Sequence, residues 1–164
     1  MNAASSIRPA TASDAAGIAL VHVQAWREAY THLLSADFLE AISVDQRTAM
    51  WSGILNSERP DRTIHVAEQS EQIVGFAFAG PARDADAPRE VELYAIYLLA
   101  AQHGSGLAQG LIEATLGQRP ASLWIAEDNP RARRFYTRNG FEADGARKAD
   151  PIGDASISEI RLVR

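Results

Sequence analysis

The fold is decided by the sequence LLAAQHGSGLA at residues 98–108. An apolar run at residues 90–99 predicts a β-strand that leads into it, and a helical pattern follows at residues 104–116. Gly104 and Gly106 carry no side chain that would block an approaching group. The first N–H groups of a helix lack internal partners, and the helix dipole adds positive charge there. The stretch therefore indicates either a phosphate-binding turn or tight packing of a helix start against a strand.

Two common phosphate-binding motifs fit this turn poorly. A P-loop ends in Gly-Lys-Ser/Thr, and the stretch has no lysine. The dinucleotide fingerprint needs a third glycine where Gln109 stands. An acidic residue, Glu127, does follow the next predicted strand, so a dinucleotide-binding oxidoreductase stays open as an alternative function.

A second segment, LWIAEDNPRARRFYTRNGF at residues 123–141, separates these alternatives. Its pattern Asn-x-x-Ala-x-x-Phe-Tyr-x-x-x-Gly-Phe closely resembles the C-terminal motif of the GNAT (Gcn5-related N-acetyltransferase) family. The turn resembles that family's Gln/Arg-x-x-Gly-x-Gly/Ala pattern, with His103, Gly106 and Ala108 at the three named positions. The two motifs stand in the family's order, 23 residues apart from Gly106 to Asn129.

Two shorter segments extend the resemblance over nearly the whole chain. Gly75-Phe76 falls on a predicted strand where the family usually has Gly-Phe, and the N-terminal Ile7-Arg8-Pro9-Ala10 before an acidic helix start is also typical. The resemblance therefore implies the GNAT fold, in which helices flank a central mixed, mostly antiparallel sheet.

Periodicity and capping signals predict the same α+β (mixed α/β) class in the order β-αα-βββ-α-β-α-ββ. Strands are expected at residues 6–9, 63–67, 73–79, 90–99, 121–126, 141–146 and 157–163. Helices are expected at residues 13–30, 35–42, from Ser43 onward, at 104–116, and from Asp128 or Asn129 through 138. The strand at 90–99 is apolar on both sides, which predicts a central strand buried on both faces.

Length and composition favour one domain over residues 1–164. The net charge of −5 argues against a nucleic-acid partner, which needs a basic surface. The absence of cysteine excludes disulfides and thiolate metal sites, and the spacing of His22 and His32 is not that of metal ligands, so no metal is expected. No apolar stretch predicts a membrane span, and the polar residues 1–8 do not resemble a signal peptide, so a cytoplasmic location is expected.

The resemblance implies that acetyl-CoA (coenzyme A) is the cofactor, with its pyrophosphate on the turn and its pantetheine arm along the preceding strand. The implied contacts are Tyr97, Leu98, His103, Gly104, Ser105, Gly106, Leu107, Ala108, Asn129 and Arg134. His103 departs from the usual Gln or Arg and is largely neutral at pH 7. The cofactor site can therefore lack one fixed donor or charge at this position. Arg131, Arg133 and Arg134 offer compensating charge, or form a solvated helix face. Asn129 can instead serve only as a helix N-cap.

Catalytic roles follow from the same resemblance. Tyr136 matches the family's general acid, because a phenol stays protonated at pH 7 and can protonate a leaving thiolate. The alternative is a core tyrosine on an amphipathic helix. Glu92, on the central strand, is the candidate general base, with Glu90 a weaker candidate. The alternative for Glu92 is a solvated residue at a strand end.

The predicted function is N-acetyl transfer from acetyl-CoA to a primary amine by direct attack in a ternary complex. The acceptor is an amine on a small molecule or a peptide, and Trp26, Tyr30, His32 and Trp51 fall in the region that shapes the acceptor site in the family. A non-catalytic acyl-CoA-binding module on the same fold is the alternative. The resemblance also allows a homodimer.

Overall fold

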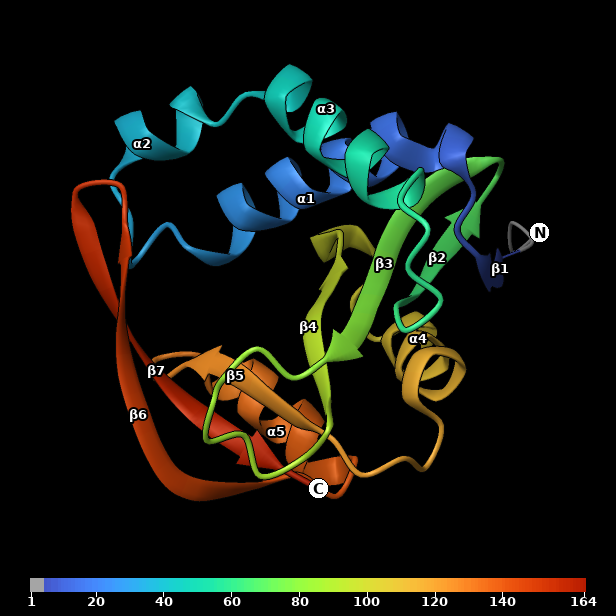
Figure 1. The fold of residues 1–164 in the computed structure, drawn as a ribbon. Coiled ribbons are helices and arrows are strands. Elements are labelled where there is room, and N and C mark those ends of the chain that lie inside the picture. The colour runs from blue at the N-terminus through green and yellow to red at the C-terminus, as the bar shows by residue number, and fades with distance from the viewer. Residues whose placement is uncertain (1–4) are drawn as a thin grey trace.

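The computed structural model describes residues 5–164, so the first four residues of the N-terminal segment 1–8 lie outside this range. Its strands are β1 (Ser5–Pro9), β2 (Thr63–Gln69), β3 (Gln72–Pro81), β4 (Val91–Leu98), β5 (Ser122–Ala126), β6 (Glu142–Ile152) and β7 (Ala155–Val163). Its α-helices are α1 (Ala15–Ala29), α2 (Ala36–Ala41), α3 (Val44–Leu55), α4 (Leu107–Leu116) and α5 (Pro130–Arg138). Figure 1 shows helices on both faces of one sheet, which confirms the predicted fold class.

The sheet has seven strands in the order β1-β2-β3-β4-β5-β7-β6. All neighbouring strands are antiparallel except β4 and β5, whose register contains the single pair Glu92 and Ser122. Beyond that pair the two strands diverge, as Figure 1 shows. The sheet therefore opens at its centre, along the half of β4 that leads to the glycine turn.

The two faces of the sheet carry different helices. On β3, Phe76 packs with α1 and α3, whereas its neighbour Ala77 packs with α4, because successive side chains of a strand point to opposite faces. The core between α5 and the C-terminal strands contains Phe141 and Leu162, both almost fully buried. The tip of the β6–β7 hairpin packs on α2, which brings the first helices against the last strands (Figure 1).

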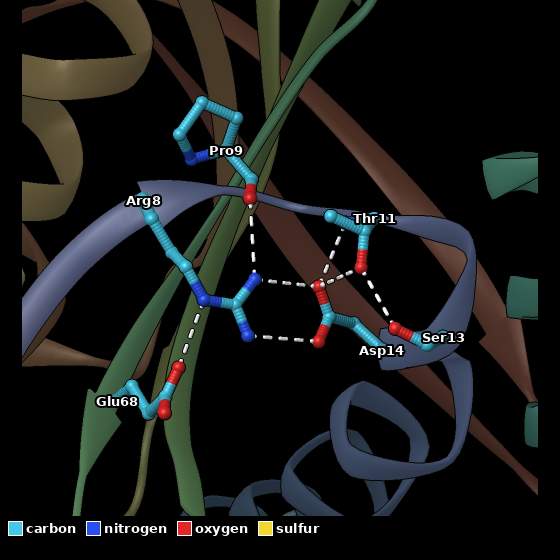
Figure 2. A network of polar contacts seen from close by, with 6 residues as sticks. All are labelled: Arg8, Pro9, Thr11, Ser13, Asp14 and Glu68. Atoms are coloured by element: carbon cyan, nitrogen blue, oxygen red, sulfur yellow. Dashed lines mark hydrogen bonds and ion pairs between the residues drawn. The ribbon is translucent and has the colours of Figure 1, made fainter. Parts of the chain in front are cut away.

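A network of charges joins the N-terminal strand to the first helix and to β2 (Figure 2). Both Nη atoms of Arg8 donate to the Asp14 carboxylate, at 2.8 and 3.0 Å, and Arg8 Nε donates to Glu68 at 2.8 Å. The same carboxylate accepts from the backbone N–H of Thr11 at 2.7 Å, which closes the turn before the helix. The Ile7-Arg8-Pro9 segment and the acidic helix start are therefore a structural unit that fixes β1 at the sheet edge.

Local signals predicted the helix starts well. Ser35, Ser43 and Asn129 are the N-caps of α2, α3 and α5, and the side chain of each accepts a backbone N–H of the first turn. Gly140 follows α5 with a φ of 83°, as expected for a left-handed helix stop. No helix within residues 5–164 is long and apolar enough to cross a membrane.

Three predictions about extent are wrong. The helix expected from residue 104 begins at Leu107, because Gly104 and Gly106 take positive φ values that no helix allows. The hairpin after residue 63 turns at Ser70 and Glu71 alone, both with positive φ, so its strands are longer than predicted. The strand predicted to end at residue 146 extends to Ile152 as β6. The sequence does not reveal this extent, because the exposed edge strand has almost no alternation of apolar and polar residues.

The prediction that residues 90–99 are buried on both faces holds only at Glu92 and Leu93. From Tyr94 onward the side chains of β4 are half-buried. The reason is the divergence of β5, which leaves this half of β4 without a close neighbour on one side. The strand is central in the sheet but has a free edge.

Candidate active site

The turn at residues 99–107 presents backbone N–H groups to one side. It begins with a short 3₁₀ turn at Ala100–Gln102, and Gly104 and Gly106 follow with φ values of 83° and 87°. Within residues 5–164, the N–H groups of Gly104, Gly106 and Ala108 have no protein acceptor. A Cβ built on either glycine would meet no atom within 4 Å. This arrangement is an open cradle of N–H donors at the start of α4, which suits a phosphate or pyrophosphate.

The turn is held by a contact from α1. The carboxylate of Glu28 accepts the backbone N–H of Ala100 at 2.7 Å. Ser105 belongs to the cradle through its hydroxyl, which accepts from the N–H of Leu107 at 3.3 Å. The position of the cradle therefore depends on α1 as well as on β4.

His103 stands at the rim of the cradle and is exposed. Partial burial and then the nearby charge of Arg131 lower its pKa, so its imidazole is neutral at pH 7. The charge of Arg131, on α5, therefore acts at the turn, whereas Arg134 is exposed and makes no hydrogen bond or ion pair with any described residue. The role of Arg134 in holding the cofactor stays a prediction.

The free edge of β4 lies beside this cradle. Tyr97 and Leu98 pair with Phe76 and Gly75 of β3 on one edge, and no residue of β5 pairs with them on the other. Their free edge is suited to hydrogen bonding with an extended, peptide-like ligand. A Cβ on Gly75 would lie 2.6 Å from Leu98 Cδ1 and 3.0 Å from Tyr97 O, which explains why glycine stands before Phe76.

Asn129 lies at the start of α5, after the end of β5. Its side-chain oxygen accepts the N–H of Ala132 at 3.0 Å, so the predicted N-cap role is confirmed. Its amide nitrogen makes no hydrogen bond to any described residue. Asn129 can therefore cap the helix and still donate to a ligand along β4.

Tyr136 lies on α5 and is 8% exposed. Its ring packs edge-to-face on Phe135 and Phe141, at centroid distances of 5.2 and 5.8 Å. Its hydroxyl makes no hydrogen bond with residues 5–164 and is not fully enclosed. Burial, and the nearby phenol of Tyr30, raise the pKa of Tyr136 above its ordinary value, which keeps the phenol protonated. Tyr136 is thus a core residue with a free hydroxyl.

Aromatic side chains from α1 face the free half of β4. His22, Trp26 and Tyr30 are spaced four residues apart and share one side of the helix. His22 stacks on Tyr97 at 5.4 Å, and Trp26 lies 4.9 Å from Tyr30. Burial raises the pKa of Tyr97 well above its ordinary value, and the phenols of Tyr30 and Tyr136 also influence it. The predicted acceptor residues Trp26 and Tyr30 therefore lie close to Tyr97 and Tyr136.

The other two predicted acceptor residues have structural contacts. Trp51 is 2% exposed, and its indole N–H donates to His22 Nδ1 at 3.1 Å. His32 Nε2 lies 3.0 Å from the carbonyl oxygen of Asp128, which ties the α1–α2 loop to the β5–α5 loop. Trp51 is a core residue, and His32 lies at the entrance to α5.

His22 makes the fold sensitive to acid. Burial, and secondarily the charge of Arg47, lower its pKa to about 4. The unfolded chain therefore takes up a proton near pH 6.5 that the folded chain resists until about pH 4, so stability falls as pH falls through this window. From pH 7.5 to 5 we expect a loss of about 2 kcal/mol in the free energy of unfolding. Urea titrations should show this loss in the wild type but not in His22→Gln, which keeps an acceptor for Trp51. If the free energies of unfolding of the two proteins followed parallel pH curves, the assignment would be contradicted.

Glu92 is 2% exposed and lies at the paired end of β4. Its carboxylate accepts the backbone N–H of Arg83 at 2.9 Å and the Arg83 guanidinium at 2.6 Å. The alternative of a solvated strand-end residue is therefore wrong, and it fits the exposed Glu90 instead. The role of Glu92 as general base stays a prediction. Its carboxylate is already paired with the Arg83 guanidinium.

The divergent sheet and the N–H cradle at the start of α4 agree with the fold of the acetyltransferases that the sequence resembles. The sequence pattern of the acetyltransferase (GNAT) family matches residues 23–141. The uncharacterized N-acetyltransferase YuaI of Bacillus subtilis is 30% identical over 96% of this chain and 97% of its own length. A probable N-acetyltransferase of Mycobacterium tuberculosis is 28% identical over 85% of this chain and 80% of its own. The chain belongs to the acetyltransferase (GNAT) family.

Solved structures of this family share the fold. The PaiA N-acetyltransferase of Thermoplasma acidophilum, solved in complex with coenzyme A, covers 95% of this chain and 98% of its own, with a TM-score of 0.67 and 19% identity. A GCN5-related N-acetyltransferase of Rhodopseudomonas palustris covers 100% of this chain and 97% of its own, with a TM-score of 0.73 and 18% identity. The expected fold is thereby confirmed.

Proposed function

We propose that this protein transfers an acetyl group from acetyl-CoA to a primary amine by direct attack in a ternary complex. The observation that carries the proposal is the N-terminal cradle of α4, which opens beside the free edge of β4. The coenzyme A complex of the structurally similar PaiA enzyme supports the choice of cofactor. The absence of a third glycine at Gln109 disfavours a dinucleotide.

The residues around the cradle fit each part of coenzyme A. The N–H groups of Gly104, Gly106 and Ala108 would hold the pyrophosphate, with Ser105, Leu107, His103 and the two arginines Arg131 and Arg134 around them. Tyr97 and Leu98 would pair with the amide groups of the pantetheine arm, and Asn129 would donate to it. The thioester supplies an activated acetyl group at the end of that arm.

The chain's own residues would then control proton movement. The attacking nitrogen forms a bond to the thioester carbon, and the C–S bond breaks. Tyr136 would give its phenolic proton to the departing sulfur and recover a proton from the new amide nitrogen. This role needs a hydroxyl that is protonated and unpartnered, and Tyr136 has both properties.

A panel of amines tests the proposal directly. With acetyl-CoA and a suitable small-molecule or peptide amine, we expect release of the free CoA thiol in proportion to acetylated product. Acetyl-CoA should also raise the melting temperature by several degrees at 100 times its Kd, where ligand binding contributes about 2.7 kcal/mol, while NAD and NADP should not. Stabilisation without product from any amine would favour the non-catalytic binding module instead.

Gly106→Ala should weaken acetyl-CoA binding about tenfold or more, because its Cβ would occupy the open space of the cradle. Gly145→Ala is the matched control, since Gly145 has a φ of 89° and the same open surroundings on a distant strand. Both variants should lose about 1–2 kcal/mol of stability to backbone strain. Isothermal titration calorimetry should show the loss of affinity in Gly106→Ala alone, and equal affinities would remove the cradle from the cofactor site.

The proposal extends to the setting of the reaction. A cytoplasmic location fits a chain without cysteine, since reducing compartments do not favour disulfide-stapled folds. A homodimer is proposed from the family resemblance alone, and sedimentation equilibrium of the purified protein would test it.

A further inference from the structure

Glu159 lies on β7, on the face of the strand that turns away from the α5 core. Ile160 and Leu162 pack with Tyr136, whereas Ile157 and Glu159 alternate with them on the opposite face. Across the sheet, Glu159 pairs with Ala126, the last residue of β5. Because β5 has separated from β4 well before Ala126, this position borders the opening in the sheet.

One aromatic residue of the proposed acceptor region, Tyr30, packs on the cluster that borders this position. Tyr30 belongs to the same apolar cluster as Ala126 and Ile157. Burial raises the pKa of Tyr30, and the negative charge of Glu159 contributes to the rise. Tyr30 in turn raises the pKa values of Tyr97 and Tyr136. Glu159 therefore borders, through its cross-strand partner Ala126, the cluster that contains Tyr30.

The Glu159 carboxylate is poorly satisfied within the protein. Its side chain is 19% exposed, and within residues 5–164 the side chain that interacts with its carboxylate is Lys148. Its nearest cation is Lys148 Nζ at 3.6 Å, and this ammonium also lies 4.3 Å from the centre of the Trp124 ring. By contrast, Glu92 has three donor groups from Arg83, and Glu127 has Arg147 at 2.6 Å and Ser158 at 3.1 Å.

We infer that Glu159 binds the protonated amine of the acceptor beside Tyr30 and removes its proton before attack. This inference rests on the proposed function. The ammonium gives one proton to the Glu159 carboxylate, which becomes a neutral carboxylic acid, and the nitrogen keeps its electron pair for the thioester carbon. Glu159 later returns this proton to solvent. The acceptor class is therefore an alkylamine that is cationic in solution.

The electrostatic surroundings raise the pKa of Glu159, which favours a role as proton acceptor. Burial raises the pKa of Glu159 above its ordinary value, Asp150 of β6 raises it further, and Lys148 of β6 and Arg83 of the β3–β4 loop lower it. Tyr30, from the end of α1, faces the same carboxylate. A raised pKa makes a carboxylate a better proton acceptor while it is still ionised at pH 7. Activity should therefore fall in acid as Glu159 protonates.

The test compares three variants with the best amine of the panel. Glu159→Gln should lower kcat/KM about 100-fold or more, raise KM for the amine and abolish the acid limb of the pH profile, with acetyl-CoA affinity unchanged. Lys148→Met should move that limb to higher pH. Glu127→Gln should behave as wild type. Glu127 directly follows Ala126, the cross-strand partner of Glu159, but its carboxylate lies on the other face of the sheet. An active Glu159→Gln enzyme with an unchanged acid limb would overturn the inference and leave the proposed function standing.

A second measurement does not depend on turnover. In protein with ¹³C-labelled glutamate carboxyls, the resonance lost in Glu159→Gln should titrate above the ordinary range and shift when propylamine is added. The same resonance should titrate higher in Lys148→Met. A Glu159 signal that propylamine leaves unmoved would overturn amine binding, even if no acceptor in the panel were turned over.

Discussion

Tyr136→Phe is expected to slow acetyl transfer by about 10²–10⁴-fold while leaving acetyl-CoA binding unchanged. The substitution removes only the hydroxyl, which would protonate the departing thiolate. It leaves the ring in place between Phe135 and Phe141. Because that hydroxyl has no partner among residues 5–164, its loss should hardly change the melting temperature. Single-turnover thiol release, with calorimetry of acetyl-CoA binding, measures both quantities.

Tyr94→Phe provides the control for this prediction. The Tyr94 hydroxyl donates to the backbone carbonyl of Pro81, and its ring packs on Phe78. Removing it takes away a phenol hydroxyl from β4 without touching the proposed centre, so stability should fall slightly and turnover should not change. Equal rates in Tyr136→Phe and the wild type, with a fast acceptor, would leave Tyr136 as a core tyrosine only.

The parts of the site that were predicted from sequence have local causes. Asn129, Pro130 and Gly140 specify the two ends of α5 through capping and dihedral preferences, so the helix and its Tyr136 followed from neighbouring residues. The glycine turn was recognised by its composition. Its extent was not, because a glycine is compatible with both a helix and a positive φ, and only the structure shows that Gly104 and Gly106 adopt the latter.

The parts that were not predicted depend on contacts between distant segments. The environment of Glu159 is made by Ala126 of β5, Lys148 of β6 and Tyr30 of α1, which no periodicity in β7 reveals. The effect of Arg131 on His103 likewise depends on how α5 packs in the fold. Alternation on β7 places a charged side chain on the Ile157 face, but it does not identify the neighbours of that side chain.

The pairing of Glu92 with Arg83 was also invisible in the sequence, because Arg83 lies in an irregular loop. Its geometry nevertheless separates two roles for Glu92. A base must exchange its proton with substrate, whereas a buried partner of an arginine positions the loop and the strand. The Glu92 side chain is 3% exposed and the Arg83 side chain is 61% exposed. The buried carboxylate therefore needs its partner more than the solvent-exposed guanidinium does. The roles can be distinguished by removing each partner in turn.

Arg83→Ala should cost about 3 kcal/mol in the free energy of unfolding, because it leaves the Glu92 carboxylate buried without its cation. The double variant Arg83→Met with Glu92→Leu should recover most of this loss, since an apolar pair of similar volume replaces the ion pair without leaving a charge behind. Urea unfolding measures the recovery. If Glu92 positions the strand and Glu159 takes the proton, the double variant should keep turnover within about tenfold of the wild type. A stable double variant that has lost turnover by 10² or more would instead assign the base to Glu92, because no loss of folding would then account for the loss of rate.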